Sequence, residues 1–233
     1  MVAIMKRELS AYFSSAIGYI FLAVYYFFSG LFFQATLASN TGSMTMIFAN
    51  MFTIILFLTP ILTMRLWSEE KKQKTDQALF TAPVKLLPVT LGKYFAALIV
   101  FVISLAINLV YAMVISFFTT PEWSVILGNM VGLFLLGAAL IAIGMFISAL
   151  TENQVIAAVG GFGVAFLVML MDALPSIIPG DFFLELITNL SFNNHYNDFS
   201  YGILNLTDVV FFLSVIVLFV FLTVRVFEKK RWS

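Results

Sequence analysis

The chain of 233 residues has no cysteine, one histidine and few charges. The lack of cysteine excludes disulfides, thiolate metal sites and cysteine nucleophiles. A single histidine excludes the paired histidines of a zinc metalloprotease, and the acids near His195 show no metal-ligand spacing. We therefore expect the segment around His195 to hydrogen-bond within itself. Only 10% of the residues are charged, against about 25% in an average soluble domain, which argues against a soluble protein.

Apolar residues are abundant instead, at 62% of the chain, and they occur in continuous runs. A run of about 20 such residues crosses a bilayer as a helix, because a helix satisfies its own backbone hydrogen bonds in lipid. A β-barrel would show short alternating segments. The sequence predicts an all-α membrane protein, a single transmembrane domain over 1–233, with six spans at about 16–38, 46–66, 93–118, 125–149, 155–172 and 208–226. We interpret the first run as a retained span rather than a cleaved signal peptide.

All 12 basic residues can be placed on one side of the membrane. They lie before the first span, around the loop after the second span, and at the end of the chain: Lys6, Arg7, Arg65, Lys71, Lys72, Lys74, Lys85, Lys93, Arg225, Lys229, Lys230 and Arg231. Because basic loops stay inside, both termini and this loop are predicted to be cytoplasmic. The acids divide evenly between the two sides, so the net charge of zero hides a basic side. This charge favours anionic lipid headgroups and does not indicate nucleic-acid binding.

Two further segments look unlike simple loops. Residues 1–15 are predicted to form an amphipathic entry helix in the headgroup plane, because their apolar residues recur at helical spacing. The alternative is a plain extension of the first span. Residues 173–207 are too apolar for a free loop and too interrupted by Pro175, Pro179 and Gly180 to span. We expect one or two short helices there, in the outer leaflet as a re-entrant segment.

The loop over residues 67–92 carries the strongest pattern. Ser68 is placed to cap a helix, and Glu69 and Glu70 suit its positive first turn. Pro83 marks the expected end of this polar helix, which would then cover 68–83. It would project from the membrane and expose Leu79 and Phe80 near its tip. From the residues alone, a solvated surface helix and a docking helix are equally good interpretations.

This loop resembles the signature of permeases of the type-2 ATP-binding-cassette (ABC) superfamily, especially short six-span members that include gliding-motility-associated permeases. The family pattern R-L-x-x-E-E-K…T…L-x-T-A-P-V is matched by Arg65, Glu69, Glu70, Thr75, Leu79, Thr81, Ala82 and Pro83. Three further stretches resemble the family in order along the chain, at residues 6–19, 146–154 and 199–226. Two positions depart from it: many members have glycine where Lys74 stands and glutamate where Gln77 stands.

The resemblance implies a permease subunit, not itself an enzyme, in the cell membrane of a bacterium. Two copies of a separate ATPase would hold ATP and Mg²⁺, and the permease would pair with a second permease chain, as a homo- or heterodimer. The chain has no G-x-x-x-x-G-K-[ST] phosphate loop, in agreement with an ATPase on another chain. The segment 68–83 would be the coupling helix. The coupling residues would be Arg65, Glu69, Glu70, Thr75, Leu79, Phe80 and Pro83.

The expected function is export, with two alternatives. A gliding-motility-like subunit would turn ATP hydrolysis into mechanical or assembly work without a cargo. A secondary transporter is disfavoured by the lack of buried ionisable pairs in the predicted spans.

Few polar residues lie in the spans. Gln34 and Asn50 are candidates for the cargo path, because the family lines its central interface with the first, second and fifth spans. The alternative for each, and for Ser104 and Asn108, is a hydrogen bond between helices. Gly128-x-x-x-Gly132, with Gly137 and Gly144, is expected to let the fourth span pack closely. Gly160, Gly161 and Gly163 are expected to do the same in the fifth span, or to let it bend.

Overall fold

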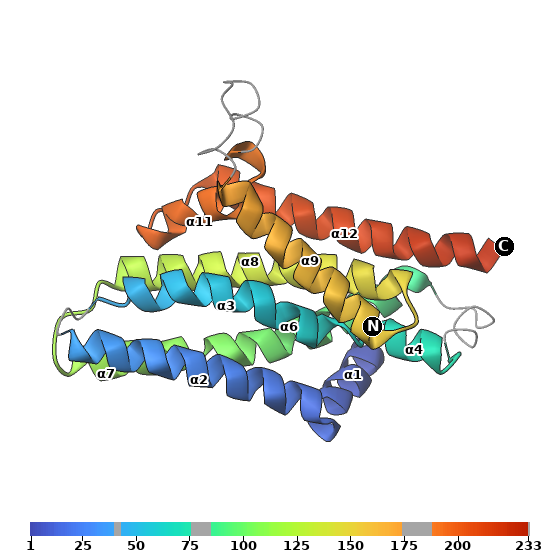
Figure 1. Cartoon of the computed structure of the whole chain (residues 1–233), viewed down its shortest axis with the longest axis horizontal. Helices are drawn as coiled ribbons and strands as arrows, with labels where there is room; N and C mark the ends of the chain where they lie inside the picture. The colour runs from blue at the N-terminus through green and yellow to red at the C-terminus, as the bar shows by residue number, and fades with distance from the viewer. Residues whose placement is uncertain (40–42, 76–84, 174–187, 233) are drawn as a thin grey trace.

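The computed structural model describes residues 1–39, 43–75, 85–173 and 188–232. In these ranges all regular secondary structure is helical, and six helices are long and apolar enough to cross a membrane. Figure 1 shows them as a bundle of roughly parallel rods, with α9 inclined across the others. The sequence-based expectation of an all-α protein with six spans is therefore confirmed.

The helices that can span a membrane agree with the predicted runs to within a few residues, apart from the third. They are α2 (Ala16–Ala38), α3 (Thr45–Thr63), α6 (Leu86–Leu105) with α7 (Ile107–Ser116), α8 (Trp123–Leu150), α9 (Gln154–Ala173) and α12 (Leu206–Trp232). Three shorter helices are α1 (Val2–Ser14), α4 (Ser68–Lys72) and α11 (Phe192–Ser200). The first covers the predicted entry segment, and the last lies within the predicted outer segment 173–207, of which residues 174–187 fall outside the described residues.

The third span begins at Leu86 rather than at Lys93, so the predicted boundary is wrong. Pro88 does not end the loop, because it lies in the first turn of α6, where proline's missing N–H has no helical partner to lose. Lys93 does not mark the first residue of the apolar helix either. Its charge is neutralised by partners from other helices, and the helix continues past it in both directions.

Helix α8 forms the centre of the bundle. In its most apolar stretch 72% of the residues are buried, against 22% in α2, α9 and α12. Its glycines explain this close packing: a Cβ on Gly137 would lie 2.1 Å from the Phe101 ring, and one on Gly144 would lie 2.2 Å from Thr63 Oγ1. The expectation that the glycines of the fourth span serve close packing is confirmed.

Helix α9 uses its glycines unequally. A Cβ on Gly161 would lie 2.8 Å from Pro60 of α3, and one on Gly160 would lie 2.8 Å from Ile147 of α8. Around Gly163 there is open space. Two of the three glycines therefore serve helix packing.

Alternation of the helix directions gives the bundle two different ends. One end, called here the basic end, gathers α1, α4, the start of α6 and the end of α12, and with them Arg7, Arg65, Lys93 and Arg225. In Figure 1 both chain termini and α4 lie toward this end, while α7 and α11 lie toward the opposite end. The basic residues of the described ranges, which the sequence places on one side of the predicted membrane, therefore lie at one end of the bundle.

Candidate functional site at the basic end

The chain leaves α3 in a short turn that is held by Ser148 of α8. The Ser148 hydroxyl accepts hydrogen bonds from the backbone N–H groups of Trp67 and Ser68, both at 3.1 Å, and donates to the Met64 carbonyl at 2.9 Å. Ser68 is not the N-cap that the sequence predicts. It is the first residue of α4, and its hydroxyl donates back to the Met64 carbonyl. A serine from another helix therefore fixes the start of α4, because it satisfies two N–H groups that lack helical partners.

Helix α4 ends at Lys72, so the continuous helix predicted over 68–83 is wrong. The Thr75 N–H bonds to the Glu70 carbonyl at 3.0 Å, and the Lys74 N–H bonds to the Lys71 carbonyl at 3.1 Å. This pair is the Schellman motif that ends many helices, with Lys74 at its left-handed position, φ 58°. That position favours glycine, which gives a physical reason for the family's glycine there. The predicted coupling residues Leu79, Phe80 and Pro83 lie outside the described residues.

Lys93 is the centre of the basic end. Its side chain is 1% exposed, and its ammonium lies 3.0 Å from a carboxylate oxygen of Glu8 in α1 and 3.0 Å from one of Glu70 in α4. It also donates to the Leu66 carbonyl at 2.8 Å. The Glu8 and Leu66 contacts are hydrogen bonds, and Glu70 adds a second carboxylate at ion-pair distance. The ammonium lies 4.9 Å from the centre of the Trp67 ring, which adds a cation–π contact.

Arg7 covers this cluster from the solvent side. One of its guanidinium nitrogens lies 2.7 Å from Glu8 and 2.5 Å from Glu70, so two cations and two carboxylates form one network. Burial by itself would raise the pKa of Glu8, but attraction to Lys93 and the hydrogen bonds from Arg7 and Lys93 outweigh it and hold that pKa below its ordinary value. The ionised Glu8 therefore stabilises the fold above the unfolded-state pKa, and this stabilisation is lost as the pH falls through the lowered value.

A second set of bonds fastens α1 to the end of α3. The Tyr12 hydroxyl donates to the Leu62 carbonyl at 2.8 Å, and burial raises the pKa of this phenol. Arg65 donates to the Ala11 carbonyl at 3.2 Å and to the Ser15 hydroxyl at 2.6 Å. The Arg65 guanidinium also pairs with Glu69 at 3.0 Å. Arg65 and Glu69, both predicted coupling residues, are thus engaged within the chain.

Lys71 and Trp67 attach α4 to the far side of the bundle. The Lys71 ammonium donates to the Ala149 carbonyl, at the end of α8, and lies 5.4 Å from the centre of the Phe227 ring of α12. The Trp67 ring lies against the same phenylalanine, with 4.0 Å between ring centres. Helix α4 is therefore held by α1, α6, α8 and α12 together.

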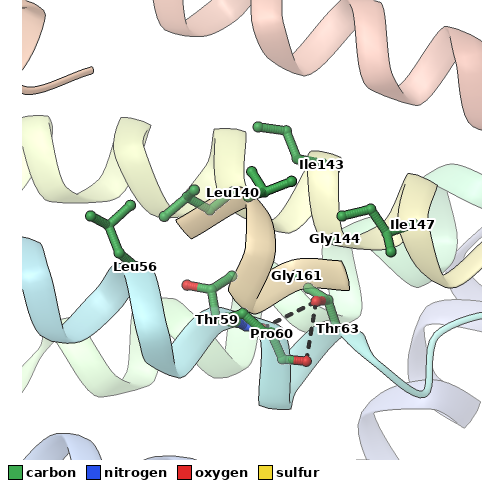
Figure 2. A pocket seen from close by; sticks show the side chains of 10 residues that line it. Leu56, Thr59, Pro60, Thr63, Leu140, Ile143, Gly144, Ile147 and Gly161 are labelled. Carbon is green, nitrogen blue, oxygen red and sulfur yellow. Dashed lines mark hydrogen bonds between the residues drawn. The ribbon is translucent and has the colours of Figure 1, made fainter. Parts of the chain in front are cut away.

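A close contact of three helices lies behind this cluster, shown in Figure 2. Thr63 and Pro60 of α3 face Gly144 of α8 and Gly161 of α9, and the Thr63 hydroxyl donates to the Thr59 carbonyl at 3.1 Å. The cavity between them has a volume of about 10 Å³, at the lower limit for one water molecule. The end of α3 that carries α4 is therefore packed against both helices with almost no free space.

The other predicted site residues lie away from the basic end. Gln34 is exposed on α2, and the partly buried Asn50 donates to the Met46 carbonyl of its own helix at 2.7 Å. Within the described residues, neither side chain makes a hydrogen bond to another helix. Asn108, in contrast, donates to the Tyr25 hydroxyl at 3.1 Å, which confirms a bond between helices at that position. Ser104 donates only to the Phe101 carbonyl of its own helix, at 2.6 Å.

His195 bonds locally at the opposite end, as expected. Its Nδ1 lies 2.6 Å from Asp208 Oδ1 and its Nε2 lies 3.1 Å from the Asn189 carbonyl. Its ring stacks on Phe211 of α12, with 3.9 Å between centres. Within the ranges that the structure describes, no group of three possible metal-binding side chains is present.

Sequence reasoning missed the central role of Lys93 and the parts played by Ser148, Trp67 and Glu8. One signal was available for Lys93: apolar residues at helical spacing continue on both sides of it, from Leu86 to Val100. A lysine in such a run needs anionic partners, because burying an unpaired charge is costly. Nothing comparable marks Ser148, whose role depends on the meeting of two distant segments.

A comparison with protein-family models found no match for this chain, and a comparison with curated proteins found none either. The arrangement at the basic end therefore has to be interpreted from its own geometry. In the part of the chain that the structure describes, it consists of ion pairs, hydrogen bonds and ring contacts between helices. Such a site can transmit force or position a helix.

Proposed function

We propose that this chain is the permease subunit of an ABC transporter, an exporter of the type-2 kind, driven by a separate ATPase chain through the loop after the second span. The observation that carries this proposal is the Lys93 network. It joins α4, which begins that loop, to α1 and α6 through buried charge. A push on the loop would therefore reach several helices at once.

The anchoring of α4 supports a mechanical role for the loop. A solvated surface helix needs no buried attachments, yet α4 is bonded on one side to Ser148 and Ala149 of α8 and on another to Lys93 of α6. The first turn of α4 is held, while its last residue, Lys72, and the following residues up to Thr75 are exposed. This arrangement suits a segment that receives a load at its tip and passes it to the bundle.

The geometry assigns different roles to the residues of the family pattern. Glu69 and Glu70 are paired with Arg65, Arg7 and Lys93, so we assign them to positioning α4 rather than to contact with the ATPase. Thr75, exposed at the end of the Schellman motif, is left as a contact residue, and Lys72 and Lys74 join it. Leu79, Phe80 and Pro83 remain expected contacts.

A second permease chain is part of this proposal. The cavity among α3, α8 and α9 is too small for a cargo, and large apolar side chains are exposed along α2 and α9, such as Phe27 and Phe166. A path for cargo would therefore form between two chains. Gln34, exposed on α2, and Asn50 on α3 would then contact cargo at that interface.

Purification from native membranes tests the ATPase assignment. The variant Lys72→Glu/Lys74→Glu should insert and fold normally but lose the co-purified ATPase and its stimulation, because it reverses the charge of the exposed end of α4. Lys6→Glu on α1 is the matched control, exposed at the same end but outside the loop, and should retain both. Equal ATPase recovery with all three proteins would contradict the proposal.

Reconstituted vesicles separate transport from mechanical work. ATP-dependent flux of an amphipathic cargo across vesicles that contain the permease and its ATPase supports export. ATP turnover that depends on the permease, with no flux of any cargo, supports a subunit that does mechanical or assembly work. Purification without any ATPase favours a secondary transporter.

The orientation is tested with introduced cysteines, which are unique because the natural chain has none. Ser43→Cys, exposed at the opposite end, should react with an impermeant thiol reagent added to intact cells. Gln73→Cys, exposed at the basic end, should react only after lysis. The reverse result would overturn the cytoplasmic placement of the basic end.

A further inference from the structure

A groove on the lipid-facing surface lies between α6 and α12, at the basic end. Its walls are apolar side chains of both helices, and its volume is about 500 Å³. Its lining residues are Leu87, Leu91, Tyr94, Phe95, Ile216, Val217, Val220, Phe221, Val224, Arg225 and Glu228. Tyr94 is bonded to the Ala138 carbonyl of α8 at 3.1 Å, which fixes one wall against the central helix.

The groove has the length of one leaflet. Along α12 it extends from Ile216 to Glu228, which is about 18 Å at 1.5 Å per residue. Half of a bilayer's hydrocarbon core is about 15 Å. The groove therefore matches the depth of a single acyl chain that enters from the headgroup region at the basic end.

Positive charge surrounds the mouth of the groove. Arg225 lies in the lining itself, exposed Lys85 is the N-cap of α6, and exposed Lys229 follows on α12. The Arg225 guanidinium is oriented by Glu228 at 2.8 Å and by the Phe221 ring, whose centre is 4.9 Å away. The bond to Glu228 uses one of five N–H donors, and a guanidinium binds phosphate through two parallel donors.

We propose that this groove is a binding site for one anionic phospholipid of the leaflet at the basic end, with an acyl chain between α6 and α12 and its phosphate beside Lys85, Arg225 and Lys229. Charge complementarity selects a lipid over an apolar partner helix as the occupant, because such a partner would offer no acidic group to Lys85, to Lys229 or to the further donors of Arg225, which is already bonded to Glu228. This inference goes beyond the proposed transport function and does not depend on it.

Quenching of a fluorescent label by brominated lipids tests the proposal. Val217→Cys, at the deep end of the groove and 68% exposed, carries a bimane label in vesicles of phosphatidylcholine with one tenth phosphatidylglycerol. Phe166→Cys on α9, 57% exposed and outside the groove, is the control on another helix. Bromine is placed on one lipid or the other.

At Val217 we expect brominated phosphatidylglycerol to occupy the groove, and so to quench the label, about fivefold more effectively per molecule than brominated phosphatidylcholine. This gain is typical of one lysine or arginine near an anionic surface. At Phe166 the two lipids should be equivalent. Lys85→Gln/Arg225→Gln/Lys229→Gln should abolish the preference, whereas Lys6→Gln/Lys72→Gln/Lys74→Gln, the same charge change at exposed positions elsewhere, should retain it.

Three outcomes would overturn the proposal. Equal quenching by the two lipids at Val217 would show only bulk lipid in the groove. A preference that survives the Lys85 triple variant would place the anionic lipid elsewhere. No quenching by either lipid, with Val217→Cys crosslinking to a second copy, would show a protein occupant. A further measurement needs no charge variant: the preference should weaken as the salt concentration rises.

Discussion

At the basic end Lys93 joins carboxylates from α1 and α4, whereas at the opposite end α11 lies directly against the backbone of α8. There, a Cβ on Gly128 would lie 2.8 Å from the Phe199 carbonyl, and Tyr196 donates to Asn129 at 2.8 Å. One end is held by charge-assisted bonds between separate helices, and the other by close contact and neutral hydrogen bonds. Ion pairs can exchange partners with small movements, while close packing resists displacement. The difference is that ion pairs between helices are added to close packing at the basic end, whereas the opposite end depends mainly on close contact.

The sharpest way to break this comparison is Lys93→Met. It leaves Glu8 and Glu70 buried without their central cation, so we expect a loss of about 3–5 kcal/mol in unfolding free energy. Thermal or denaturant unfolding in a mild detergent would measure it. Adding Glu8→Gln and Glu70→Gln to Lys93→Met should recover part of the loss, because no uncompensated charge then remains. A single variant as stable as the natural chain would show that the network does not hold α4.

At the opposite end, Gly132→Ala tests close packing. The new methyl group would lie 2.7 Å from Phe199 Cβ and 2.9 Å from the Tyr196 ring, so we expect a cost of about 1–3 kcal/mol. Gly163→Ala is the matched control, because nothing lies within 4 Å of its added methyl group. The same unfolding assay compares them. If both substitutions have the same effect, the opposite end is not held by close contact.

His195 and Asp208 form a bond to a charged group at the opposite end. A double-mutant cycle measures how much this bond contributes to the free energy of unfolding. With His195→Ala, Asp208→Asn and the double variant, we expect a coupling of about 1.5 kcal/mol, as for a hydrogen bond to a charged group. Unfolding measured at neutral pH gives the coupling. A value of zero would mean that α11 is held on α12 by contacts between aromatic rings, such as Phe192 with Phe212, and not by this charged bond.

The smallest expected effect concerns backbone strain. Among the described residues, φ is positive at Lys74 (58°) at the basic end and at Gly202 (75°) at the opposite end. Lys74→Gly should stabilise the chain by up to about 1 kcal/mol, because a lysine is strained in this conformation. A decrease in stability would contradict the Schellman geometry of α4. Differential scanning calorimetry or helix-resolved hydrogen exchange would detect the change.

The architecture could be predicted from the sequence because a bilayer allows few solutions. Runs of apolar residues specify spans, and the one-sided bases agree with the end at which the structure gathers them. Errors arose where a tertiary contact replaced a local rule. Ser68 looks like a cap, but Ser148 takes that role, and Lys93 looks like a boundary until Glu8 and Glu70 neutralise it.

The candidate site was predictable in location but not in its bonds. The pattern around Glu69 and Glu70 singled out the loop that α4 begins, and the coupling role of this loop stays a prediction. The pattern could not show that Glu70 reaches the buried Lys93, because the two residues belong to different helices, whereas the pair of Glu69 with Arg65, four residues earlier, has a spacing that the sequence contains. The helix end at Lys72 was missed for another reason: a lysine at the left-handed position gives no glycine signal.

The bond between Glu8 and Lys93 also has a consequence for how the protein is made. The two residues are 85 positions apart, so the entry helix has no central cation until the ribosome has produced the start of the third span. At about 5–20 residues per second, this wait lasts roughly 4–17 seconds. During that time Glu8 has only the adjacent Arg7 of the two cations that it contacts in the final structure. Its final docking is therefore a late step of biogenesis, although it is the first segment to be synthesised.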